Sequence, residues 1–291
     1  MRLLTVLTAL LASLSFTSLV KAEIFTFTAI PDQDTSRLQQ RFDRVANHLQ
    51  QRLGVEVKYI PVKSYAAAVT AFRNNQVQLA WFGALSGLQA RLRVPGSRAI
   101  AQGYEDQFFL TYLIAHRSSG LLDEIDQSTF PLGIAGQTFT FGAKGSTSGR
   151  LIPEYYIREN FGEAPDKLFK RVGFSGDHNR TIALVGAGAY QVGAVNYKVW
   201  QKALLDERVD PQQVQVIWQT PAYSDYQWSI RGDVNQHWGE GFIDRVQDAL
   251  LAIDQPALLS AFPRTAFVSA SNSDYQATHD IALKIGLIDA R

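Results

Sequence analysis

The chain has 291 residues, of which 46% are hydrophobic, and its 28 basic and 27 acidic residues give a formal net charge of +1. This balance is typical of a globular protein and gives no indication of nucleic-acid binding. The chain contains no cysteine, which excludes a disulfide framework and a thiolate metal site.

The N-terminal segment has the features of a secretory signal. Arg2 supplies a positive charge ahead of an apolar run over 3–20, and Val20-Lys21-Ala22 fits a cleavage site. A transmembrane anchor is the alternative, but the run is rich in serine and threonine and ends in small residues. We therefore expect residues 1–22 to be a cleaved signal peptide and the mature protein to be periplasmic.

The segment after this signal alternates between strand-like and helix-like patterns. Short apolar runs predict the strands, and apolar residues three or four apart, such as Phe42, Val45 and Leu49, predict the helices. The expected elements are strand 24–30, helix 38–53, strand 55–60, helix 65–73, strand 77–82, helix 84–92 and strand 99–104. This βαβαβαβ order is typical of a parallel sheet with helices on both faces.

A second series of alternating strands and helices follows, and it begins with a long apolar strand. The expected elements are strand 108–115, strand 138–142, helix 146–159, strand 171–174, helix 181–187, strand 191–197, helix 199–205, strand 214–218, an extended aromatic segment from 220, a helix over 242–253 and a shorter helix ending near 287. Two such series joined by extended segments predict an α/β protein of two lobes, each with a mostly parallel sheet, joined by two crossing strands around a cleft. We expect lobe one to hold 23–112 and 223–291, and lobe two to hold 113–222.

Three consecutive hydroxyl residues, Ser146, Thr147 and Ser148, lie where a predicted strand and glycine-rich turn lead into a helix. The free N–H groups and the dipole at a helix N-terminus favour anions. Gly145 and Gly149 would let a ligand approach the backbone closely. An ordinary helix cap is the alternative, but it explains one hydroxyl and not three. The pattern therefore predicts a cradle for a tetrahedral oxyanion.

Other polar groups also follow predicted strands, where ligands bind in α/β sheets. These candidates are Tyr65, Trp81, the Gly83 and Ala84 amides, His178 and Asn196. Each has a plainer alternative. Tyr65 and Trp81 could pack in the core, His178 could cap a helix and Asn196 could be a turn residue.

These segments together resemble a known family. The matching stretches are Ser64-Tyr65-Ala66-Ala67, Leu79-Ala80-Trp81-Phe82-Gly83, Ser119-Gly120, Phe141 to Gly149 with Ile152-Pro153, Phe174-Ser175-Gly176-Asp177-His178 and Gly193-Ala194-Val195-Asn196. The chain resembles, over nearly all of its mature length, the periplasmic phosphonate- and phosphite-binding proteins of ABC importers, which have the type II solute-binding fold. The resemblance implies that Ser146, Thr147 and Ser148 hold the oxyanion, that His178 donates to it, and that Tyr65 closes from the other lobe.

The resemblance also guides the choice of ligand. Relatives that bind aminoalkyl phosphonates use carboxylates and tyrosines for the amine, whereas the matching positions here include Asn196 and Phe108-Phe109-Leu110. A cationic amine would lack a counter-charge, so a small oxyanion with an uncharged substituent is expected. The nearest branch of the family carries the label selenate-binding. Phosphite, phosphonates, selenate, selenite and sulfate all remain open.

Catalysis is not expected. Residues 144–148 lack the Gly-x-Ser-x-Gly pattern of a serine hydrolase, which is an alternative function with Ser146 or Ser148 as nucleophile. The five histidines are scattered without metal-ligand spacing, so we expect no metal and no cofactor. The expected partners are an ABC permease and its ATPase, with the protein itself a monomer. A sensor that feeds a separate signalling receptor is the other alternative.

Overall fold

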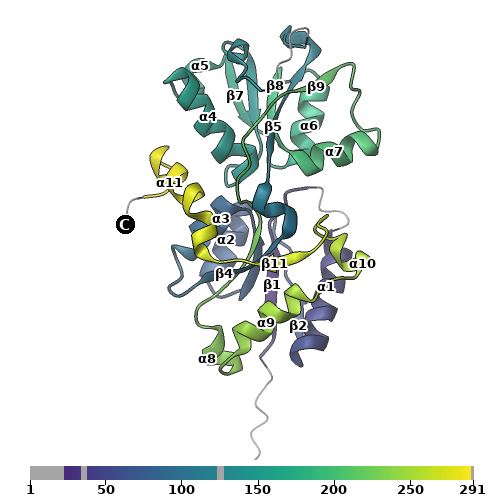
Figure 1. Cartoon of the computed structure of the whole chain (residues 1–291), viewed down its shortest axis with the longest axis vertical. Helices are drawn as coiled ribbons and strands as arrows, with labels where there is room; N and C mark the ends of the chain where they lie inside the picture. Colours follow the sequence, from purple (N-terminus) through teal and green to yellow (C-terminus); the bar gives the residue numbers. More distant parts are fainter. Residues whose placement is uncertain (1–22, 34–37, 123–127, 290–291) are drawn as a thin grey trace, which may run out of the picture.

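The computed structural model describes residues 23–33, 38–122 and 128–289. It contains two separate sheets, which lie one above the other in Figure 1. The predicted signal peptide, 1–22, lies outside the described residues. Within the described ranges, no helix has the length and apolar character needed to cross a membrane.

Lobe one is built on a six-stranded sheet with the strand order β11-β4-β10-β3-β1-β2. Its strands are β1 (Phe25–Ala29), β2 (Val57–Tyr59), β3 (Leu79–Phe82), β4 (Arg98–Gly103), β10 (Gln227–Ile230) and β11 (Phe267–Ser269). Strands β1, β2 and β3 are parallel, as their alternation with helices predicts. Strand β10 runs antiparallel between β3 and β4, so the sheet is mixed and not a continuous parallel array.

The helices of lobe one cover this sheet. They are α1 (Leu38–Leu53), α2 (Tyr65–Arg73), α3 (Ala84–Arg91), α8 (Val234–Trp238), α9 (Phe242–Leu251), α10 (Pro256–Leu259) and α11 (Gln276–Lys284). The spacing that predicts α1 places Phe42, Val45 and Leu49 in the core, where each is at most 2% exposed. Ser64 starts α2 by accepting a hydrogen bond from the Ala67 amide at 3.1 Å.

Lobe two is built on a five-stranded sheet with the order β7-β6-β8-β5-β9. Its elements are β5 (Thr111–His116), β6 (Thr138–Phe141), α4 (Ile152–Phe161), α5 (Pro165–Leu168), β7 (Arg171–Phe174), α6 (His178–Gly186), β8 (Val192–Asn196), α7 (Tyr197–Leu205) and β9 (Val214–Gln219). Strands β6, β7 and β8 are parallel, and β5 is antiparallel to both β8 and β9. The carboxyl ends of β6, β7 and β8 point toward lobe one (Figure 1).

The chain crosses between the sheets twice, after β4 and after β9. The two crossing segments are tied together, since the Phe109 and Tyr223 backbones exchange hydrogen bonds of 2.8 and 3.1 Å and the Asp225 amide donates to the Asp106 carbonyl at 3.0 Å. The predicted strand over 108–115 starts only at Thr111, because residues 104–108 form a 3-10 turn. The predicted lobe boundaries at 112/113 and 222/223 stay a prediction.

The lobes also share apolar packing. Leu85 and Leu88 of α3 form one cluster with Leu151 and Ile152 of lobe two and with Ala282 of α11. In addition, α11 reaches lobe two through an ion pair of 2.8 Å between Lys284 and Glu159. The contact between the lobes thus includes a hydrophobic part beside the candidate site.

Candidate functional site

The three predicted hydroxyls lie between the lobes. Ser146 caps the turn after β6, because its Oγ accepts from the Gly149 amide at 2.9 Å. The helix expected over 146–159 begins as a π-helical turn, η5 (Thr147–Leu151), and continues as α4. Ser146, Thr147 and Ser148 are each at most 2% exposed. Buried hydroxyls need hydrogen-bond partners, so their enclosure favours a polar site over a simple cap.

Gly149 is required by this arrangement. A Cβ at Gly149 would lie 2.9 Å from Ser146 Oγ and 3.1 Å from His178 Cε1. Since real Cβ atoms rarely approach that closely, a larger residue would displace the cap or the histidine. The glycine in the Ser-Thr-Ser-Gly motif therefore brings the turn and His178 together.

Thr147 is the hydroxyl that contacts lobe one directly. Its Oγ1 accepts a hydrogen bond of 3.1 Å from the Leu85 amide in the first turn of α3. A Cβ at Gly83, which precedes α3, would lie 3.1 Å from the same oxygen. The N-terminus of α3 and the N-terminus of η5 therefore meet at Thr147.

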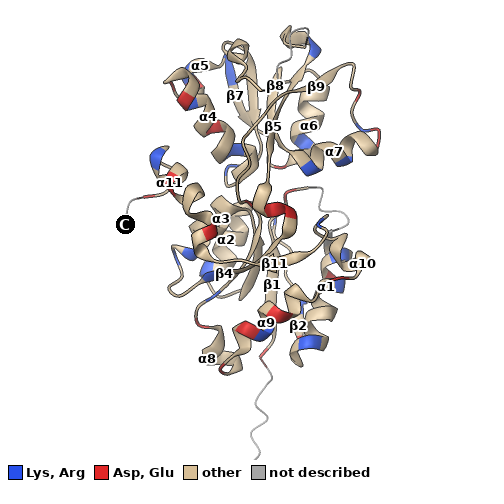
Figure 2. Cartoon of the chain, in the orientation of Figure 1, with Lys and Arg blue, Asp and Glu red and all other residues tan. Residues whose placement is uncertain are grey.

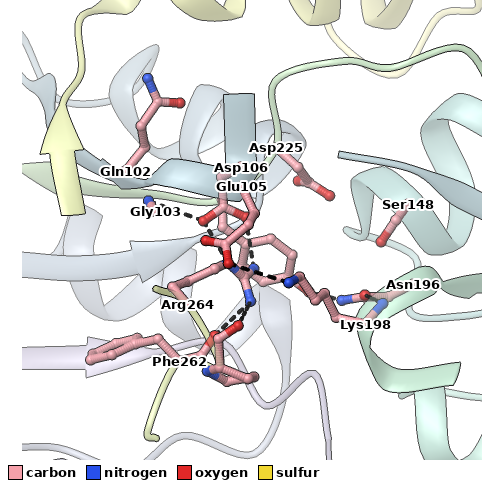
Figure 3. Close-up of polar contacts among 12 residues, drawn as sticks. Gln102, Gly103, Glu105, Asp106, Ser148, Asn196, Lys198, Asp225, Phe262 and Arg264 are labelled. Atoms are coloured by element: carbon pink, nitrogen blue, oxygen red, sulfur yellow. Dashed lines mark hydrogen bonds and ion pairs between the residues drawn. The ribbon is translucent and has the colours of Figure 1, made fainter. Parts of the chain in front are cut away.

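Asp225 is a site residue that sequence reasoning did not assign. Its Oδ1 accepts from the Ala84 amide at 3.0 Å, and its Oδ2 has no hydrogen-bond partner among the described residues. Figure 3 shows its carboxylate, on the segment after β9, and the Ser148 hydroxyl pointing into the same space. Burial raises the pKa of Asp225 to about 7, against the opposing hydrogen bonds from the Ala84 amide and the Thr147 side chain. The Ala84 amide, predicted to bind the oxyanion, thus binds this carboxylate in the structure.

His178 begins α6, three residues before the helix start expected at Thr181. Its Nδ1 accepts from the Asn196 amide at 3.3 Å, which leaves the proton on Nε2, 3.4 Å from Ser148 Oγ. Burial lowers the pKa of His178 to about 3, so the ring is neutral at physiological pH. A neutral imidazole with Nε2–H can donate one hydrogen bond to an anion beside Ser148.

Asn196 takes part in a chain of hydrogen bonds between the lobes. Its Oδ1 accepts from the Lys198 and Val199 amides and so caps α7, while its Nδ2 donates to the Tyr226 hydroxyl at 3.1 Å. Tyr226 in turn donates to Asp32 Oδ2 at 2.7 Å. Both polar groups of Asn196 therefore have protein partners, and its predicted contact with a ligand stays a prediction.

Asp32 and Tyr226 were not assigned to the site from sequence. Asp32 lies just beyond β1, and its carbonyl accepts from the His178 amide of lobe two at 3.1 Å. Burial raises the pKa of Asp32 to about 6. The position of Asp32 after a predicted strand is the signal that marks the other candidates, whereas Asp225 and Tyr226 precede a strand that the pattern did not predict.

Three tyrosines and Trp81 complete the walls of the candidate site. Tyr65 starts α2 at 4% exposure, and a Cβ at Gly145 would lie 3.2 Å from its Cβ. Burial raises its pKa well above 10, so its hydroxyl stays a donor. The Tyr223 hydroxyl lies 2.7 Å from Thr111 Oγ1, and Trp81 stacks on Tyr226 with ring centroids 5.6 Å apart. Tyr223 and Tyr226 therefore bring hydroxyls to the site as well as packing the crossing segments.

The donor set is what an oxyanion needs. Buried hydroxyls and a neutral imidazole lie together where two helices begin, and no group of three His, Cys, Asp or Glu side chains in the described part of the chain could hold a metal ion. A family model for the periplasmic phosphonate-binding proteins of ABC transporters matches residues 27–275. The chain belongs to this family.

Individual relatives agree with this assignment. A probable ABC transporter phosphite-binding protein, PhnD1, of Prochlorococcus marinus is 38% identical over 265 residues, which cover 89% of each chain. The phosphonates-binding periplasmic protein of Escherichia coli is 25% identical over 229 residues, covering 73% of this chain and 66% of the relative. The structure of PhnD1 in complex with methylphosphonate is similar with a TM-score of 0.81 and 37% identity, covering 91% of this chain and 99% of that one.

These findings settle the coarse predictions. The two-sheet α/β solute-binding fold is confirmed. The prediction that the protein is not an enzyme is also confirmed, because the relatives are substrate-binding proteins of transporters. Membership of a periplasmic family of ABC importers implies a permease and an ATPase as partners.

Proposed function

We propose that this protein binds a small phosphonate or phosphite in the periplasm and delivers it to an ABC permease. The proposal depends on one observation: Ser146, Thr147 and Ser148 are all buried at a helix start between the lobes, with His178 Nε2 3.4 Å from Ser148 Oγ. The relatives named for phosphite and methylphosphonate support the same ligand class. Export through a cleaved signal peptide is part of this proposal.

Closure of the lobes would follow from ligand contacts on both sides. Lobe two provides the hydroxyls and His178, while lobe one provides Tyr65 and the start of α3. A ligand favours the closed state only by as much as it binds that state better. Charge-assisted hydrogen bonds of about 1.5–3 kcal/mol each make a bridging oxyanion sufficient for this purpose.

Asp225 narrows the choice of oxyanion. Its Oδ2 lacks a partner in the described structure, so it can accept a hydrogen bond from a ligand hydroxyl. Phosphite and methylphosphonate carry such a proton in their monoanionic forms, whereas selenate and sulfate have none at neutral pH. The ionised form of Asp225 would repel a bare oxyanion oxygen, so at a pH above its pKa of about 7 we propose that phosphite and phosphonates bind in preference to selenate and sulfate.

Asp225 also bears on amine-containing ligands. The expectation that aminoethylphosphonate binds poorly rests on Asn196 and on the missing tyrosine hydroxyls over 108–110, but Asp225 and Asp32 are carboxylates close to the site. If Asp225 accepts the ligand's hydroxyl proton, the buried carboxylate of Asp32 is less available to an ammonium, because its Oδ2 already accepts from Tyr226. We therefore keep aminoethylphosphonate below methylphosphonate in the proposed order of affinity.

Titration calorimetry with phosphite, methylphosphonate, aminoethylphosphonate, sulfate and selenate tests this proposal. We expect phosphite or methylphosphonate to bind most tightly and sulfate and selenate to bind at least about a hundred-fold more weakly, about 2.7 kcal/mol. Tightest binding of selenate or sulfate would overturn the role of Asp225. Tightest binding of aminoethylphosphonate would show that Asp225 or Asp32 acts as an ammonium partner.

A further inference from the structure

A large cleft lies directly outside the enclosed site. It has a volume of about 1010 Å³ and is lined by Lys63 and Tyr65 of lobe one and by Lys144, Phe174 and Arg180 of lobe two. Tyr65 lines this cleft, and its pKa responds to the side chain of Ser146 on the site side. The cleft is therefore separated from the oxyanion cradle by little more than Tyr65 and the Gly145 turn.

The walls of this cleft are strongly basic. Among the described residues that line it, five are cationic and one, Asp177, is a carboxylate. The whole chain has a formal charge of only +1, so this excess is local. Figure 2 shows a basic position at the end of α6 that faces lobe one.

Three of the cations have no carboxylate partner in the described part of the chain. Arg150 pairs with Glu154, and Arg208 pairs with Asp206. In contrast, the exposed side chains of Lys63, Lys144 and Arg180 form no ion pair within the described ranges. They come from three different segments and both lobes. No ion pair among the described residues of the wall therefore neutralises their charges.

Phe174 supports the cations beside the Gly145 turn. Its ring is 40% exposed and lies under Lys144 at 5.4 Å and Arg150 at 5.3 Å. Cation–π contact holds such groups over a fixed surface without cancelling their charge. The arrangement therefore keeps positive charge at the edge of the cleft next to the cradle.

We propose that Lys63, Lys144 and Arg180 form an approach channel that attracts anionic ligands into the cleft before the lobes close. This inference rests on the proposed function. The cradle itself contains neutral donors, so the long-range attraction must come from groups outside it. Low-dielectric walls lined by one sign of charge raise association rates about 10- to 1,000-fold. Because the bound ligand lies behind Tyr65, these cations should affect its arrival far more than its retention.

The test is the variant Lys63→Gln/Lys144→Gln/Arg180→Gln, measured by stopped-flow tryptophan fluorescence with methylphosphonate. In about 0.01 M salt, where the Debye length is about 30 Å, we expect the association rate constant to fall about ten-fold. In 1 M salt, where that length is about 3 Å, variant and wild type should agree within about two-fold. The dissociation rate constant should change little.

A control variant removes the same charge elsewhere. Arg44, Arg52 and Lys170 are exposed and do not line the cleft. Arg52 lies in the last turn of α1, and Lys170 lies just before β7. The matching glutamine variant should keep the wild-type association rate within about two-fold.

The outcomes separate the two proposals. Equal association rates in all three proteins at low salt, or an equal fall in both variants, would overturn the approach channel alone. A change confined to the dissociation rate would overturn it as well, because it would place the cations in the bound complex. If wild type binds neither methylphosphonate nor phosphite, the proposed function fails and the channel fails with it.

Discussion

Replacing Asp225 with asparagine should stabilise the ligand-free protein at neutral and higher pH. The side chain is 1% exposed, and one of its two oxygens has no hydrogen-bond partner in the described part of the chain. Its pKa rises from 3.8 to about 7 on burial. Each pH unit of such a difference corresponds to about 1.4 kcal/mol, so holding the carboxylate ionised at pH 8 costs the folded state about 4 kcal/mol.

The pH dependence has a definite sign. Between about pH 4 and pH 7 the folded protein keeps a proton on Asp225 that the unfolded chain has released. The free energy of unfolding of the wild type therefore falls as the pH rises through this window. Asp32 and His178 also titrate, with pKa values of about 6 and about 3, but they contribute equally to both proteins.

Urea unfolding of wild type and Asp225→Asn from pH 4.5 to pH 8 measures this difference. We expect the variant to be about 2–4 kcal/mol more stable at pH 8, and about 1 kcal/mol or less at pH 4.5. Asparagine keeps an oxygen for the Ala84 amide, so the fold should survive. A gap that does not change with pH, or a variant that is less stable at pH 8, would refute the reasoning.

Three further variants test the contacts between the lobes. Thr147→Ala removes the acceptor of the Leu85 amide and the hydroxyl proposed to contact the ligand, so methylphosphonate affinity should fall about ten-fold or more in calorimetry. Unchanged affinity would remove Thr147 from the proposed site. Gly83→Ala places a Cβ 3.1 Å from Thr147 Oγ1. We expect methylphosphonate affinity to fall about ten-fold, while the Tm of the free protein stays within a few degrees. An affinity equal to that of the wild type would show that the lobes adjust to the Cβ without cost. Asn196→Asp keeps the cap of α7 but replaces the donor to Tyr226 with a carboxylate. Binding of phosphite should therefore weaken relative to binding of aminoethylphosphonate in the same assay. An unchanged ratio of the two affinities would exclude a charge effect at this position.

The local patterns of the sequence determined much of the fold and the centre of the site. The spacing of Phe42, Val45 and Leu49 predicts α1, and Ser64 predicts the start of α2, because helical periodicity and capping depend on neighbours within one or two turns. The Ser-Thr-Ser-Gly motif identifies the buried turn between β6 and α4 for the same reason. These features need no information from distant parts of the chain.

Only the tertiary structure decided what faces that turn. Strand β10 is buried at all four residues, so it has no alternating pattern that would reveal it, and it enters the sheet between β3 and β4. Its position brings Asp225 to the Ala84 amide, 141 residues away in sequence, and Tyr226 to Asp32, 194 residues away. Strand order depends on long-range packing of apolar surfaces, which a single segment does not encode. The hydroxyls of the cradle are thus a local property of the sequence, and the carboxylates opposite them are a property of the folded sheet.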